Sequence, residues 1–352
     1  MICFDFNNIH GQGMALKIIG HRGNGRTTET PFLEGKAPQS SLESFRQAIE
    51  DNHADGVEFD VFVSADGVPI VIERDEIDGM KISDLSYENL LGYNLAPDGL
   101  HPSLDEALRF LHDLGIRLNR KLVINIELKG RSVTRPTLEA VERAAEEYGF
   151  DANQVHYSSF DRDKLASVRM RQPSAIIQPT IATTQLFAAN DVTIPGYSVP
   201  LTAQYNKAAL TDLSEFLTEF NCAAIDVPTC DIRPELIDFA ARHDVGFCTH
   251  PSGPRLYENR GMLVESFRLL HEYAEEQDVI IKVDDIALTR ALFRQYSEQK
   301  TYQVPASFDM EKIPPLCDDG FIHYQLKEND LTYEGKGQDE ILERIMGTPF
   351  LR

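Results

Sequence analysis

The chain has 352 residues, of which 42% are apolar and 26% charged, and these fractions are typical of a soluble globular protein with a full core. Its 34 Lys and Arg against 56 Asp and Glu give a net charge of −22. This acidity argues against nucleic acid or an anionic membrane as a partner, because phosphate-rich surfaces require a basic face. It is compatible with cation binding.

The cysteines and the N-terminus bear on cellular location. Five cysteines are widely spaced without a C-x-x-C motif, so we expect reduced, mostly buried thiols. Residues 1–14 are predicted to form an irregular arm and lack the basic and apolar regions of a signal peptide. No apolar run approaches the roughly 18 residues of a membrane span. A cytoplasmic location is therefore predicted, although export without an N-terminal signal stays open and the oligomeric state is not predicted.

Short β-rich runs alternate with amphipathic segments along most of the chain, as in βα units. Strands are predicted at residues 16–19, 57–63, 121–127, 154–158, 175–180, 222–227, 245–249 and 278–283. Helices are predicted at residues 40–51, 101–114, 136–148, 161–170, 210–220, 234–243, 261–276 and 286–297. We also expect residues 69–72 to form a hairpin return of the second strand and residues 181–207 to form a long loop.

This alternation predicts an α/β fold, a closed (β/α)8 barrel over residues 15–303, rather than an open doubly wound sheet. An irregular C-terminal extension, residues 304–352, is expected to contain a helix at 338–346. Polar residues directly follow several strands, and in a barrel they would share the C-terminal mouth, where barrel enzymes carry their chemistry. These residues are His21, Asp60, Glu127, Ser159, Asp226, His250 and Asp284.

Two carboxylates lie on one face of the second strand. Val57, Phe59 and Val61 alternate with Glu58 and Asp60, so the period of two places both acids on the face opposite the apolar residues. Like charges on one strand face repel, whereas a divalent cation is bound by oxygen ligands two residues apart. The sequence leaves two interpretations of this stretch: a cation site, or a solvated antiparallel hairpin.

The third strand carries a similar pattern. Asn125, Glu127 and Lys129 alternate with Ile124, Ile126 and Leu128, so three polar groups share one face. On a central strand such groups require partners, whereas on an edge strand they would face water. The first interpretation adds Glu127 to the other two acids.

Three carboxylates at a barrel mouth form a ligand set for Mg²⁺ or Ca²⁺. His21, Arg22 and Gly23 follow the first strand directly. This H-R-G tripeptide has two interpretations: His21 and Arg22 are functional groups, or the tripeptide only turns the chain. Together with Lys129 they would neutralise a phosphate and move a proton. A metal, a cationic clamp and an acid/base group are what phosphodiester cleavage requires.

Several motifs in a fixed order resemble the glycerophosphodiester phosphodiesterase (GDPD) family. They are HRG after the first strand, GVEFDVFVSADGVPIVI, HPSLDEAL, INIELK and YSSFD, and the resemblance extends from about residue 17 to residue 286. It implies a TIM barrel in which Glu58, Asp60 and Glu127 hold a divalent metal. It also implies that His21 is a catalytic acid/base and that Arg22 and Lys129 contact the phosphate of a small-molecule phosphodiester.

Two positions depart from the family pattern. The acidic residue of the family's P-E-N-T motif is Gln39 here, and the second catalytic histidine of the family falls on Glu73, which is followed by Arg74. We predict that Glu73 acts as the second catalytic group, and that Gln39 and His250 contact the substrate. A lone loop histidine such as His250 also has a structural explanation.

The loss of the second histidine leaves the reaction open. A metal-dependent hydrolase yielding a phosphomonoester and an alcohol is the predicted function, with activity weakened or altered. The alternatives are a catalytically impaired barrel that binds a phosphorylated ligand, and a lyase or transferase that forms a cyclic phosphate on the same scaffold.

Overall fold

The computed structural model describes residues 16–27, 36–93, 101–187, 204–251 and 260–290, and the backbone of residues 325–326 and 331–332. Residues 1–299 and 300–352 form separate compact units. In the second unit, β12 (Gln325–Leu326) pairs antiparallel with β13 (Leu331–Thr332). The predicted arm, residues 1–14, and the predicted helix at 338–346 lie outside the described residues.

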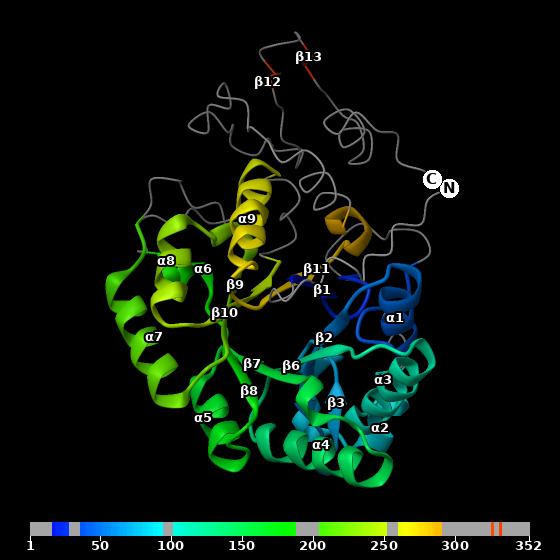
Figure 1. Cartoon of the computed structure of the whole chain (residues 1–352). Helices are drawn as coiled ribbons and strands as arrows, with labels where there is room; N and C mark the ends of the chain where they lie inside the picture. The colour runs from blue at the N-terminus through cyan, green and yellow to red at the C-terminus, as the bar shows by residue number, and fades with distance from the viewer. Residues whose placement is uncertain are drawn as a thin grey trace. The chain divides into compact units, whose positions relative to one another are not determined.

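The first unit is built on a ring of eight parallel strands (Figure 1). The order around the ring is β8-β7-β6-β2-β1-β11-β10-β9, and a parallel bridge from Thr180 to Asp226 joins its two ends. The predicted (β/α)8 barrel is therefore confirmed. The strands are β1 (Leu16–Gly20), β2 (Gly56–Val63), β6 (Val123–Leu128), β7 (Val155–Ser159), β8 (Ile176–Pro179), β9 (Ala224–Pro228), β10 (Gly246–His250) and β11 (Val279–Val283).

Helices lie around the outside of this ring (Figure 1). Residues 286–290, the last described part of the first unit, are also helical. The α-helices are α1 (Leu42–Arg46), α2 (Tyr87–Leu91), α3 (Leu104–Leu118), α4 (Thr134–Tyr148), α5 (Arg162–Arg171), α6 (Thr183–Leu186), α7 (Lys207–Phe220), α8 (Pro234–Arg242) and α9 (Arg260–Tyr273). Short 3-10 turns are η3 (Ile82–Asp84), η4 (Ala152–Gln154) and η5 (Thr229–Asp231).

A hairpin leaves the barrel after β2. β3 (Pro69–Val71) pairs antiparallel with the end of β2, as predicted. β4 (Glu76–Ile77) and β5 (Met80–Lys81) form a second small hairpin, and the segment ends in α2. A separate apolar cluster that includes Phe62, Ile72 and Ile82 holds this segment together.

Apolar packing lies mainly between the strands and the helices. Val57, Phe59 and Val61 are fully buried on the outer face of β2, where the ring of Phe59 stacks on Phe45 of α1 at 5.3 Å. A smaller apolar cluster joins β1, β6, β10 and β11 and consists of Ile19, Val123, Cys248 and Ile280. Because the outward positions take the apolar residues, the alternating acids of β2 point the other way, into the barrel.

Two predicted elements differ from the structure. The helix predicted at 40–51 is α-helical only to Arg46 and continues as a π-helical segment, η2 (Gln47–Asp51). The loop predicted at 181–207 begins with the short helix α6, and its residues 188–203 lie outside the described part. Among the described residues, no helix is both long and apolar enough to cross a membrane.

Candidate active site

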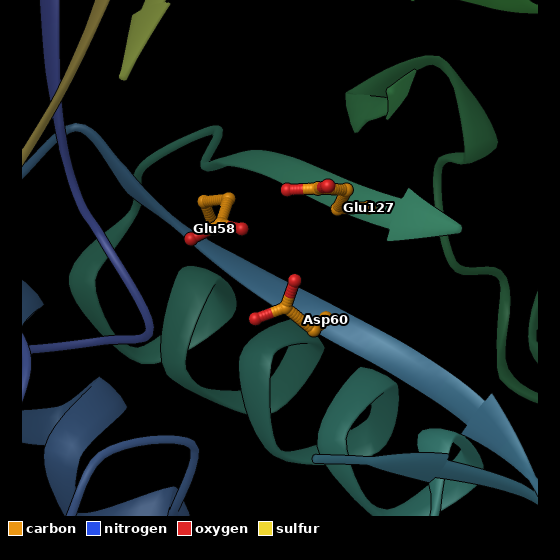
Figure 2. A group of neighbouring side chains, drawn as sticks. All are labelled: Glu58, Asp60 and Glu127. Carbon is orange, nitrogen blue, oxygen red and sulfur yellow. The ribbon is translucent and has the colours of Figure 1, made fainter. Parts of the chain in front are cut away.

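Three carboxylates from the paired strands β2 and β6 lie close together (Figure 2). Glu58 and Asp60 come from β2, Glu127 comes from β6, and Asp60 and Glu127 are register neighbours on the paired strands. One oxygen from each lies within 4.8 Å of the others. Their exposed fractions are 0%, 1% and 7%, so the solvated hairpin interpretation is wrong.

The buried triad concentrates carboxylate oxygens. Glu58 Oε1 is buried without a hydrogen-bond partner, whereas the buried Asp60 Oδ2 and Glu127 Oε1 face the cationic groups of Arg22 and Lys129. An unsatisfied buried oxygen is costly, and hard carboxylate oxygens in this number are the donors that Mg²⁺ and Ca²⁺ prefer. The side chains present therefore fit a divalent cation.

Burial and the neighbouring charges shift the pKa values of all three carboxyl groups. Burial, reinforced by Asp60 and Glu127, raises the pKa of Glu58 to about 8. Burial also raises the pKa of Asp60 to about 6, against the effects of Lys129 and Arg22. For Glu127, burial opposes the shift, but Lys129 and Lys282 together outweigh it and lower the pKa. A cation in the triad would relieve the mutual repulsion of these groups.

His21 lies next to the triad in a defined orientation. Its Nδ1 lies 2.8 Å from Asp284 Oδ1 and its Nε2 lies 3.9 Å from Glu58 Oε2. Because a carboxylate only accepts, Nδ1–H is the donor and Nε2 is the basic nitrogen. Burial lowers the pKa of His21 to about 4, although Asp284 opposes the shift, so the imidazole is neutral near pH 7.

Asp284 is itself held in place. Arg26 donates to it from the backbone N–H at 3.0 Å and from Nε at 2.8 Å, and its second guanidinium nitrogen lies 2.6 Å from Asp284 Oδ2. Burial opposes ionisation of Asp284, but His21 and Arg26 keep its pKa well below the usual range. Arg26 and His21 from the loop after β1, and Asp284 directly after β11, thus form a hydrogen-bonded chain of cation, carboxylate and imidazole.

Two cations border the triad. Arg22 Nε lies 3.3 Å from Asp60 Oδ2, and Lys129 Nζ lies 2.5 Å from Glu127 Oε1 and 3.4 Å from Asp60 Oδ1. The backbone of Arg22 has a φ of 52°, which is uncommon for a non-glycine residue, and its N–H donates to Glu58 Oε2 at 2.9 Å. The loop therefore directs the guanidinium toward the triad.

The other predicted site residues are placed as follows. Glu73 Oε1 lies 3.3 Å from a terminal nitrogen of Arg22, with its side chain 26% exposed. Gln39 is buried and reciprocates hydrogen bonds with Thr27 at 3.1 Å, which ties the two ends of the β1–α1 loop together. His250, the last residue of β10, lies 2.9 Å from Asp226 through Nδ1.

Sequence reasoning missed Lys282, in the middle of β11. Its side chain is 1% exposed, and Nζ lies 2.5 Å from Asp226 Oδ2 and 3.4 Å from Asn125 Oδ1. Asp226, although buried, is ionised, because Lys282 and His250 outweigh burial and lower its pKa. The sequence does contain a pattern that indicates this position. Lys282 lies on the strand face opposite Val279, Ile281 and Val283, and this face points into the barrel.

The family profile described as the glycerophosphoryl diester phosphodiesterase family matches residues 21–243, more than half of the chain. The protein therefore belongs to the glycerophosphodiester phosphodiesterase family. It is 26% identical over 174 residues to a glycerophosphodiester phosphodiesterase from Caldanaerobacter subterraneus subsp. tengcongensis, an alignment that covers 46% of this chain and 64% of that protein. The chain thus spans less than two thirds of the curated relatives that it matches.

Solved structures of the same architecture support the fold. A glycerophosphodiester phosphodiesterase from Galdieria sulphuraria superposes with a TM-score of 0.57 at 20% identity, covering 80% of this chain and 99% of that one. A phosphodiesterase from Oleispira antarctica, in complex with the product sn-glycerol-3-phosphate, superposes with a TM-score of 0.55 at 16% identity, covering 80% and 97%. At these identities the likeness establishes the TIM-barrel fold alone.

Proposed function

We propose that the protein is a divalent-metal-dependent phosphodiesterase that hydrolyses a glycerophosphodiester-type substrate to a phosphomonoester and an alcohol. The observation that carries the proposal is the meeting of Glu58, Asp60 and Glu127, with one ligand oxygen of each within 4.8 Å of the others and all three side chains buried. His21 and Arg22 stand directly beside this set. Family membership favours the same chemistry.

Each group of residues has a separate role in the proposed reaction: metal binding, phosphate binding or proton transfer. A Mg²⁺ or Ca²⁺ ion held by the triad would supply Lewis-acid stabilisation of the phosphoryl oxygens. Arg22 and Lys129 would hold the remaining negative charge of the phosphate. His21, neutral and with its Nδ1–H donated to Asp284, offers Nε2 to accept a proton from the attacking water. The predicted roles of Glu73 as second catalytic group and of Gln39 as substrate contact stay predictions, and Glu73 lies at ion-pair distance from Arg22.

A turnover assay tests the reaction. Glycerophosphocholine, glycerophosphoethanolamine and lysophospholipids are incubated with Mg²⁺, Ca²⁺ or EDTA, and the product is identified by phosphorus NMR. We expect a phosphomonoester that is lost with EDTA, and a fall of about 10² or more in His21→Ala. A cyclic phosphate would indicate the lyase alternative. Substrate binding without turnover, with turnover gained by Glu73→His, would indicate the impaired barrel.

Metal binding is tested separately by thermal unfolding. Mg²⁺ or Ca²⁺ that binds the folded protein raises its melting temperature by mass action. Asp60→Asn is expected to abolish this response, whereas Asp84→Asn, which changes an exposed carboxylate, is expected to keep it. An unchanged response in Asp60→Asn would place the metal elsewhere.

The predicted cytoplasmic location remains part of the proposal. It is supported by Cys222, Cys230 and Cys248, which are free and buried, as expected in a reducing compartment.

A further inference from the structure

A second imidazole at the barrel mouth is held in the same way as His21. His250 Nδ1 lies 2.9 Å from Asp226 Oδ1, so its Nδ1–H donates to the carboxylate. The other oxygen, Asp226 Oδ2, accepts from Lys282 Nζ at 2.5 Å and from Thr180 Oγ1 at 3.2 Å. The exposed fractions of Asp226 and Lys282 are 0% and 1%. These buried hydrogen bonds hold the Asp226 carboxylate in one position.

The two arrangements match group by group. In the first arrangement, Asp284 accepts hydrogen bonds from Arg26 and from His21 Nδ1. In the second, Asp226 accepts hydrogen bonds from Lys282 and from His250 Nδ1. Each histidine lies at the C-terminal end of a barrel strand, at the edge where barrel enzymes carry their chemistry. In each case the carboxylate orients the ring and leaves Nε2 for a proton transfer.

His250 and Lys129, one of the cations proposed to contact the phosphate, contact the same phenyl ring. Its ring contacts Phe160, which follows β7, with centroids 6.0 Å apart in an edge-on arrangement. Lys129 Nζ lies 5.1 Å from the centroid of the same phenyl ring and pairs with Glu127. The side chain of His250 is 16% exposed, and none of the described residues is hydrogen-bonded to its Nε2. The free nitrogen is therefore accessible at the mouth.

Glu73 is less suited to donate a proton. It lies at ion-pair distance from Arg22, and a carboxylate committed to a guanidinium serves as an acceptor. The barrel thus has two oriented imidazoles, while the position of the family's second histidine carries an acceptor.

We propose that His250 is a catalytic residue that protonates the leaving oxygen, with Asp226 and Lys282 as positioning residues. The inference rests on the proposed phosphodiesterase function. Water attacks phosphorus while His21 Nε2 takes its proton, the P–O bond to the alcohol breaks, and the proton on His250 Nε2 moves to the departing oxygen. One water is consumed, and the phosphomonoester and the alcohol are released. The proton gained by His21 then returns through solvent to His250.

Two glycerophosphodiesters that differ only in the leaving group test this role. Choline is a poor leaving group that requires a proton, whereas p-nitrophenolate leaves without one. His250→Asn retains an N–H donor for Asp226 but lacks Nε2. We expect a loss of about 10²–10⁴ in kcat with glycerophosphocholine and less than about tenfold with the p-nitrophenyl ester. Imidazole added to His250→Ala is expected to restore part of the first activity.

Glu73→Gln is the matched control, expected to affect both esters equally. Equal losses on both esters in His250→Asn, without imidazole rescue in His250→Ala, would overturn the inference by showing a merely structural role. A loss confined to glycerophosphocholine in Glu73→Gln would also overturn it, because Glu73 would then be the proton donor. Wild-type protein that cleaves neither ester with metal would overturn the proposed function itself.

Discussion

At the scale of single residues, Asp284 controls which nitrogen of His21 is basic. An asparagine in its place offers an NH₂ group to Nδ1 and so favours the tautomer that carries its proton on Nε2. We expect Asp284→Asn to lower kcat by about 10²–10⁴ while the metal-induced rise in melting temperature remains. The exposed control Asp278→Asn should change neither. Wild-type kcat in Asp284→Asn would show that His21 needs no oriented tautomer.

Lys282 and Asp226 form a buried ion pair whose disruption is costly. Lys282→Met leaves Asp226 as an uncompensated charge in the barrel interior, so we expect a loss of about 3–5 kcal/mol in the free energy of unfolding. Adding Asp226→Asn removes that charge and should recover part of the loss. Urea unfolding of the wild type, the single variant and the double variant measures both effects. A loss below about 1 kcal/mol, typical of a surface pair, would contradict the prediction.

Residues of the site differ in how far the sequence predicts them. Strand alternation was sufficient for Glu58 and Asp60, because a period of two assigns each side chain to a face. Glu127 followed from the same pattern on β6. The pairing of Asp226 with Lys282 was not predictable, because β10 separates their strands and the two side chains meet only inside the closed ring. The roles of His21, Arg22, Lys129, Gln39, Glu73 and His250 stay predictions.

At the scale of elements, Asp231 in η5 secures the short helix α6. Thr183 Oγ1 donates to Asp231 Oδ2 at 2.6 Å, and Tyr205 donates to the Asp231 carbonyl at 2.5 Å. The carboxyl group is 1% exposed, and burial raises its pKa from 3.8 to about 7. This contact links the start of the segment predicted as a long loop to the end of β9.

The raised pKa of Asp231 makes this contact pH-dependent. The folded state favours the protonated form, so the stabilisation is fully present below pH 3.8 and is lost as the pH rises through about 7. Asp231→Asn keeps an acceptor for Thr183 and cannot ionise. We expect the variant to gain a few kcal/mol on the wild type between about pH 5 and pH 8. Urea unfolding at both pH values measures the difference, and a pH-independent difference would contradict the prediction.

The helices show why boundaries were harder to predict than elements. The capping box of Ser103 and Glu106 predicted the start of α3, and both of its hydrogen bonds are present. The π-helical turn η2 was not predicted, because apolar periodicity does not distinguish an i−4 from an i−5 hydrogen bond in one final turn. There Asn52 N–H donates to Gln47 O at 3.0 Å, while Gln47 Oε1 accepts from Ala37 N–H at 2.8 Å.

At the scale of the whole molecule, the regular alternation of strands and helices was enough to predict the closed barrel. Closure depends on pairing between the first and last strands, and β1 pairs with β11 from Leu16 with Val279 to Gly20 with Val283. Sequence periodicity predicts where each strand lies along the chain. It does not predict the bridge between Thr180 and Asp226, which joins the β8 end of the ring to β9. The eight ring strands and the three carboxylates of the candidate site lie within residues 16–290.

Because all eight ring strands precede residue 284, a chain that ends at Gln299 retains the complete barrel. We expect this truncated chain to unfold cooperatively, to keep the metal-induced rise in melting temperature, and to retain kcat/KM within about threefold. A matched truncation after Gln277 removes β11 and with it the partners of both β1 and β10, so it should not fold. Circular dichroism and thermal unfolding compare the three chains. Loss of the metal response in the chain ending at Gln299 would show that residues 300–352 contribute to the site, and the predicted division at about residue 303 would then be wrong.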